Sequence, residues 1–87
     1  MKKILMFTMA SCPYCQRAQQ WMSELCAENP AYRAIPVEFI DEVINPGLAN
    51  QYDYYYVPTY YVDGEKVHEG AATREIIKSV YEKAMAD

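Results

Sequence analysis

The sequence has few basic residues, little glycine and no long apolar run. Eight lysines and arginines stand against twelve acidic residues, which gives a net charge of −4. This balance argues against a nucleic-acid-binding protein, because such a protein needs a basic surface. No segment approaches the ~20 apolar residues of a membrane-spanning helix, so no membrane association is expected. Three glycines and five prolines are also too few for a disordered or fibrous chain.

Residues that bind metals are scarce as well. The chain has three cysteines and one histidine. An odd number of cysteines does not fit a secreted disulfide framework. A zinc site would need all four of these side chains, but Cys26 lies on the apolar face of a predicted helix and His68 lies in a strand pattern. We therefore predict no metal site.

The N-terminal stretch MKKILMF is similar to the start of a signal peptide. Its apolar part is short, however, and runs into a polar Cys-Pro-Tyr-Cys turn instead of a small-residue cleavage site. A cytoplasmic location is therefore expected. Apolar and aromatic residues make up 52% of the 87 residues, and residues 1–87 are predicted to form one domain with one core.

The first half of the chain has the pattern of a strand-helix-strand unit. Residues 3–8 form an apolar run too short for a helix, which predicts a strand buried on both faces. Pro13 then occupies a favoured first helical position, and the helix ends at Asn29-Pro30. The apolar face of this helix comprises Ala18, Trp21, Met22, Leu25 and Cys26. Residues 35–40 form a second strand, parallel to the first.

The next part of the chain predicts a short helix and then a hairpin. Asn45-Pro46 is typical of a helix start, and Asp53 is expected in the left-handed conformation at the end of this helix. Residues 58–62 and 66–69 form two strands joined by Asp63-Gly64, the strongest hairpin signal in the sequence.

The C-terminal segment predicts a capped amphipathic helix. Thr73 is placed to cap it. Its apolar face comprises Ile76, Ile77, Val80, Tyr81 and Ala84. The order β-α-β-α-β-β-α predicts an α/β fold, with a mixed four-stranded sheet and helices on both faces. The cysteine motif falls at the carboxyl end of the first strand, where α/β sheets usually place their sites.

Cys12 and Cys15 lie where a helix N-terminus favours thiol chemistry. With Pro13 as the first helical residue, Cys12 is the N-cap, and its sulfur is expected to accept a hydrogen bond from the Cys15 N–H. This bond and the helix dipole both favour the thiolate form of Cys12. Spacing of three residues brings the two sulfurs near disulfide distance. Cys12 is therefore predicted to attack a substrate disulfide, and Cys15 to resolve the mixed disulfide.

Other interpretations of a single C-x-x-C motif are less favoured. A structural disulfide across so short a loop would stabilise the chain little on the chain-entropy model. Zinc lacks a convincing ligand set, as described above. The position between a strand and a helix favours a redox pair.

The motif and a second segment resemble those of glutaredoxins, within the thioredoxin superfamily. The matching residues are Cys-Pro-Tyr-Cys at 12–15 and the stretch YVPTYYVDG at 56–64. The resemblance covers nearly the whole chain. It implies a thioredoxin-like fold, a thiol–disulfide oxidoreductase activity and a cis peptide bond between Val57 and Pro58, beside Cys12.

This resemblance also implies a substrate surface. The backbone N–H and C=O of Val57 would pair with a substrate chain in a short β-augmentation. Pro13, Tyr14, Tyr56 and Pro58 are the other predicted substrate-binding residues. Tyr54 and Tyr55 are further candidates for an aromatic rim around the site, since binding residues often lie on loops.

Two departures from the glutaredoxin pattern bear on glutathione. Met9 stands three residues before Cys12, where family members often carry a lysine or arginine that meets a glutathione carboxylate. The stretch VHEGAATRE replaces a Gly-Gly pair with a following aspartate, and it places Glu69 near the approach of an anion. We therefore expect a preference for protein disulfides over glutathionylated proteins. No bound cofactor is expected, and the electron donor would be a thiol reductant, either glutathione or a thioredoxin-type reductase.

Two non-enzymatic functions stay open at this point. A dimer could hold an iron-sulfur cluster through Cys12 and external thiols, although a proline after the first cysteine usually argues against this in the family. Alternatively, the cysteine pair could act as a redox switch in a binding protein.

If the protein is instead a thiol–disulfide oxidoreductase, it is expected to be a monomer.

Overall fold

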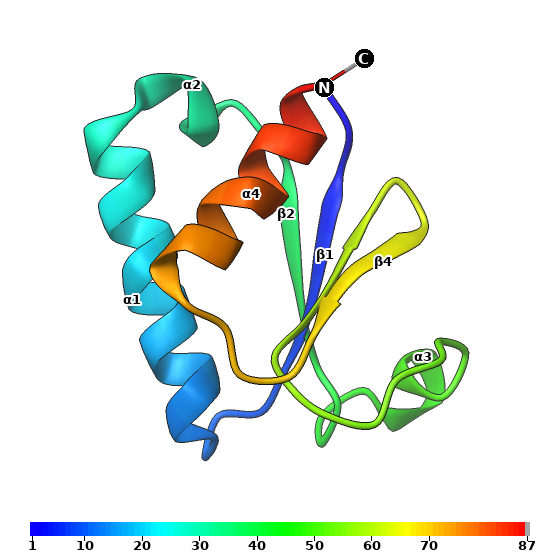
Figure 1. Ribbon diagram of the computed structural model, residues 1–87. Helices are drawn as coiled ribbons and strands as arrows, with labels where there is room; N and C mark the ends of the chain where they lie inside the picture. The colour runs from blue at the N-terminus through cyan, green and yellow to red at the C-terminus, as the bar shows by residue number, and fades with distance from the viewer. Residues whose placement is uncertain (87) are drawn as a thin grey trace.

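A mixed four-stranded sheet forms the centre of the molecule (Figure 1). The computed structural model describes residues 1–86. The elements in chain order are β1 (Ile4–Thr8), α1 (Pro13–Glu28), α2 (Pro30–Arg33), β2 (Val37–Asp41), α3 (Pro46–Ala49), β3 (Thr59–Val62), β4 (Glu65–Glu69) and α4 (Arg74–Met85).

The strands lie in the order β2-β1-β3-β4. β1 and β2 are parallel, while β1 and β3, and β3 and β4, are antiparallel. Helices α1 and α4 lie side by side on one face of this sheet, and the short helix α3 lies near one end of the other face (Figure 1). The predicted parallel unit, hairpin and helices on both faces are confirmed.

Each face of the sheet carries its own apolar cluster, because successive strand residues point to opposite sides. In β3, Tyr60 packs under α1 and α4, and Tyr61 packs on the α3 side. The larger cluster contains Ile4, Met6, Ala18, Met22, Leu25, Tyr32, Ile35, Tyr60, Val62, Ile77, Val80, Tyr81 and Ala84. The smaller contains Phe7, Ile40, Ala49 and Tyr61. Burial on both sides explains why the sequence of β1 is a continuous apolar run.

Two details of the chain path differ from the sequence-based expectation. After α1, the Asn29 side chain accepts a hydrogen bond from the Ala31 N–H at 3.1 Å, so the asparagine that ends one helix also caps the single turn of α2. Among residues 1–86, Asp63 is the non-glycine residue with a positive φ, 52°. The left-handed conformation predicted for Asp53 is therefore wrong. Asp63 adopts it because the two-residue hairpin turn with Gly64 requires positive φ.

No helix among these 86 residues is long and apolar enough to cross a membrane.

Candidate active site

Cys12 lies at the junction of β1 and α1, as the N-cap of the helix. Its backbone is extended, and its sulfur accepts a hydrogen bond from the Cys15 N–H at 3.2 Å. The Cys12 carbonyl in turn accepts the Gln16 N–H at 3.0 Å. Pro13 fills the first helical position, where its missing N–H leaves no bond unmade. The sulfur therefore sits at the positive end of a 16-residue helix and receives one of its free N–H groups.

Cys15 is the more secluded of the two thiols. Cys12 is 8% exposed and Cys15 is 0% exposed. Burial, and then the hydrogen bond with the Cys12 side chain, raise the pKa of Cys15 to about 11. The Thr8 hydroxyl acts in the opposite direction and lowers that pKa. Thr8 is itself buried, and a hydrogen bond from its hydroxyl to the Cys15 sulfur is the cause of this lowering. At neutral pH Cys15 is therefore a buried thiol beside the Thr8 hydroxyl.

The segment before β3 approaches Cys12 from the other side. The Val57–Pro58 peptide bond is cis. The Cys12 thiol donates a weak hydrogen bond to the Val57 carbonyl oxygen, with 3.9 Å between sulfur and oxygen. Pro58 is buried, and its carbonyl accepts the Gly70 N–H at 2.8 Å. The structure thus brings Cys12 and Cys15 together with Val57 and Pro58, although Cys12 and Val57 are 45 residues apart in sequence.

Three of the four tyrosines predicted to rim the site are exposed. Tyr14, Tyr55 and Tyr56 are 59%, 86% and 70% exposed, and Pro13, next to Tyr14 in the chain, is exposed as well. Tyr54 does not belong to this group. Its ring lies 4.7 Å from the ring of Phe7, centroid to centroid, and its hydroxyl donates to Glu42 at 2.9 Å. Tyr54 therefore anchors the loop to the sheet instead of facing a substrate.

Glu69, at the end of β4, binds the backbone of the loop that precedes Val57. Its Oε2 atom accepts the backbone N–H groups of Tyr55 at 2.7 Å and Tyr56 at 3.1 Å. Its Oε1 atom forms an ion pair with Lys66 at 2.7 Å. These contacts lower the pKa of the Glu69 carboxyl, through the Lys66 hydrogen bond first and the Tyr55 N–H second. Glu69 lies 13 and 14 residues after Tyr56 and Tyr55 in the sequence. No local sequence pattern predicts a hydrogen bond between groups so far apart, so the sequence analysis missed this role.

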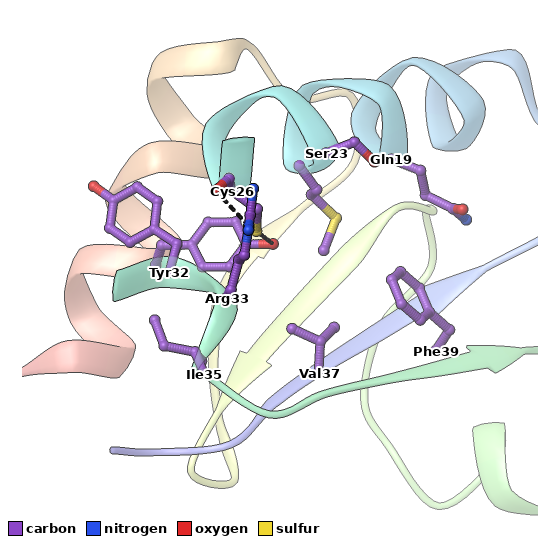
Figure 2. Close-up of a pocket in the computed structure, with 10 residues that line it drawn as sticks. Gln19, Ser23, Cys26, Tyr32, Arg33, Ile35, Val37 and Phe39 are labelled. Atoms are coloured by element: carbon purple, nitrogen blue, oxygen red, sulfur yellow. Dashed lines mark hydrogen bonds between the residues drawn. The ribbon is translucent and has the colours of Figure 1, made fainter. Parts of the chain in front are cut away.

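The third cysteine and the histidine make contacts with groups other than the dithiol. Cys26 follows Cys12 along α1, roughly 20 Å further on along the helix axis. It lines a groove of about 350 Å³ between α1, α2 and β2, shown in Figure 2, and its thiol donates to the Tyr81 hydroxyl at 3.5 Å. His68 Nε2 contacts the carbonyl oxygens of Gly70 and Ala71. Across residues 1–86, no three side chains of the metal-binding types gather as a potential metal site.

A dithiol at the N-terminus of a helix, beside a cis-proline segment that leads into the neighbouring strand of a mixed sheet, defines a thioredoxin-like site. Comparison with known proteins agrees with this class. Residues 2–82 match the family model described as a thioredoxin domain. A thioredoxin of Methanocaldococcus jannaschii is 34% identical over 83 residues, which cover 95% of this chain and 95% of that protein.

Solved structures show the same fold. The solution structure of oxidised thioredoxin from Plasmodium falciparum superposes with a TM-score of 0.73 at 22% identity, covering 98% of this chain and 82% of that one. A mutant thioredoxin from Halobacterium salinarum gives a TM-score of 0.71 at 26% identity, covering 98% of this chain and 75% of that one. The chain therefore belongs to the thioredoxin family. The thioredoxin-like fold predicted from sequence is confirmed, and the glutaredoxin-like subtype stays a prediction.

Proposed function

We propose that this protein is a thiol–disulfide oxidoreductase that reduces protein disulfides through Cys12 and Cys15. Membership of the thioredoxin family supports the reaction class. The observation that carries the proposal is the hydrogen bond from the Cys15 N–H to the Cys12 sulfur, at the N-terminus of α1. This bond places the Cys12 sulfur at the positive end of α1, whereas the Cys15 sulfur is 0% exposed, so Cys12 is the proposed nucleophile.

The reaction follows from the different surroundings of the two sulfurs. The Cys12 thiolate attacks one sulfur of the substrate disulfide, and the other substrate sulfur leaves as a thiolate that takes up a proton. Cys15 then loses its proton and attacks the Cys12 sulfur. This step forms the Cys12–Cys15 disulfide and releases the second substrate thiol. Two electrons pass to the substrate, and an external thiol reductant returns them.

Val57 supports a peptide as the substrate. Its carbonyl oxygen lies 3.9 Å from the Cys12 sulfur, at the point that a substrate disulfide must reach. Within residues 1–86, no group accepts a hydrogen bond from the Val57 N–H. An extended substrate chain can pair with both groups. Tyr14 and Tyr56, whose side chains are exposed, lie two residues after Cys12 and one before Val57. Pro13 and Pro58 directly follow Cys12 and Val57 in the chain.

The charges near the site argue against glutathione as the preferred partner. Glutathione carries two carboxylates, which need cationic side chains or free N–H groups. Met9 supplies no charge. The N–H groups of Tyr55 and Tyr56 already bind the Glu69 carboxylate, which would repel a second anion. A thioredoxin-type reductase is therefore our proposed electron donor, and the dithiol is proposed to act in a cytoplasmic monomer with no bound cofactor.

A comparison of two substrates tests this function. Catalytic efficiency would be measured on insulin, whose disulfides are those of a protein, and on a glutathionylated protein, with the same reductant in both assays. We expect preference for insulin, and no turnover for Cys12→Ser. The matched control is Cys26→Ser, which removes a thiol remote from the site. Preference for the glutathionylated protein, with glutathione as an efficient donor, would refute the proposed specificity. Turnover by Cys12→Ser would refute the mechanism.

A further inference from the structure

The segment that would receive the substrate is held by a carboxylate from the neighbouring strand. Glu69 Oε2 accepts two consecutive backbone N–H groups, those of Tyr55 and Tyr56, immediately before Val57. Hydrogen bonds to an ionised acceptor are stronger than those between neutral groups. Because this loop precedes the first residue of β3, the ladder between β3 and β4 does not hold it.

The second carboxylate oxygen is also engaged. Lys66 Nζ lies 2.7 Å from Glu69 Oε1, and it donates a further bond to the Asp53 carbonyl oxygen at 3.1 Å. The ion pair thus engages the Glu69 carboxylate, and the Lys66 bond to Asp53 attaches the loop at a third point. Both side chains are partly exposed, 37% for Lys66 and 21% for Glu69, so the contribution of the ion pair alone is small.

These bonds leave Tyr56 with no free backbone group. Its N–H binds Glu69, and its carbonyl oxygen accepts a hydrogen bond from the Thr59 hydroxyl. Both polar groups of the residue before Val57 are thus satisfied within the protein. The first backbone positions offered to a substrate are those of Val57, whose carbonyl oxygen faces Cys12.

We propose that Glu69 is a positioning residue for substrate, which holds the Tyr55–Tyr56 backbone so that the Val57 N–H and C=O lie in register with Cys12. The proposal rests on the proposed function, because it assigns a role in the binding of a protein disulfide. Glu69 does not touch the reacting sulfurs. It acts by keeping the loop ordered before the substrate binds. A loop that is already ordered loses less entropy on binding, so its order increases the affinity for a large substrate.

Substitution of Glu69 tests this role. In Glu69→Ala the two N–H groups lose their acceptor, and the Michaelis constant for insulin should rise roughly tenfold with kcat changed less than about twofold. The alkylation rate of Cys12 by iodoacetamide should not change, because that small reagent needs no backbone pairing. Glu69→Gln keeps one oxygen that can accept both N–H groups but loses the ion pair with Lys66, so it should restore part of the affinity for insulin.

The matched control is Glu65→Ala, which removes the same charge from an exposed position of the same strand. Thermal unfolding of each variant checks that the fold is kept, and amide hydrogen exchange measures protection of the Tyr55 and Tyr56 N–H groups. Faster exchange in Glu69→Ala together with the raised Michaelis constant supports the proposal. An equal effect of Glu65→Ala, an unchanged Michaelis constant in Glu69→Ala, or no rescue by Glu69→Gln would overturn it. Failure of the wild-type protein to reduce insulin would instead overturn the proposed function.

Discussion

Limiting alkylation at neutral pH should label Cys12 and leave Cys15 free. The perturbation is a substoichiometric dose of iodoacetamide given to the reduced protein at a pH of about 7. Only thiolates react at an appreciable rate, so labelling reports which sulfur is ionised and accessible. Cys12 is at a helix N-terminus and reaches the surface, whereas Cys15 is 0% exposed.

The size of the difference follows from the Cys15 environment. Burial and the Cys12 hydrogen bond raise the pKa of Cys15 to about 11. At neutral pH this leaves about one Cys15 in ten thousand ionised. Its labelling should therefore rise about tenfold for each pH unit and level off only near a pH of about 11. Burial of the Cys15 sulfur lowers its rate of alkylation further, so the raised pKa and the burial both reduce labelling of Cys15.

Peptide mass spectrometry can resolve the three cysteines. Trypsin cuts after Lys3, Arg17 and Arg33, so peptide 4–17 carries Cys12 and Cys15, and peptide 18–33 carries Cys26. Fragment ions that separate Cys12 from Pro13 then locate the label. The control is Cys12→Ser, in which Cys15 should stay unlabelled. Comparable labelling of Cys12 and Cys15 at neutral pH, or labelling of Cys15 that does not rise as the pH is raised, would refute this assignment.

Two further changes test how the surroundings of the dithiol are used. Thr8→Val removes a buried hydroxyl whose hydrogen bond lowers the Cys15 pKa. Attack of Cys15 on the mixed disulfide should therefore slow about tenfold while the fold is kept. With 5,5′-dithiobis(2-nitrobenzoate), release of the first chromophore should match the wild-type protein and release of the second should lag; equal second phases would contradict the role of Thr8. Cys26→Ala should keep insulin turnover within about twofold, because Cys26 is remote from the site. It should lower the free energy of unfolding by about 1 kcal/mol, because it removes a weak hydrogen bond to Tyr81. Denaturant unfolding and the insulin assay measure the two effects, and a large loss of turnover in a folded Cys26→Ala protein would show that this thiol takes part in the reaction.

The parts of the fold that could be predicted from sequence depend on short-range signals. A proline after Cys12 fixes the first helical residue, and this sets the N-cap bond seen at 3.2 Å. Asp63-Gly64 likewise fixes a hairpin turn, and both residues have positive φ, 52° and 84°. Thr73 caps α4 by accepting the Ile76 N–H at 3.2 Å. In each case the physical cause lies within a few residues, so the local pattern is sufficient.

The parts that could not be predicted depend on contacts between distant segments. Neighbouring tyrosines of the same loop have different surroundings. The ring of Tyr54 packs on Phe7, whereas Tyr56 is 70% exposed. Their order in the sequence does not distinguish them, because the position of β1 beneath the loop decides which ring is buried. The role of Glu69 is similar, since the register of β3 with β4 brings it to the Tyr55 and Tyr56 N–H groups.

The loop before Pro58 is attached near both of its ends, and this bears on why the site contains so many tyrosines. A tyrosine can bury an aromatic ring and still offer a hydroxyl to a polar partner. Tyr54 does so with Glu42, and Tyr61 packs on the ring of Phe7 while its hydroxyl donates to the Asp53 carbonyl oxygen at 2.8 Å. Asp53 therefore has bonds from Tyr61 on β3 and from Lys66 on β4. The loop is held at its start by these groups and at its end by Glu69, and these contacts keep the Val57 carbonyl oxygen facing Cys12.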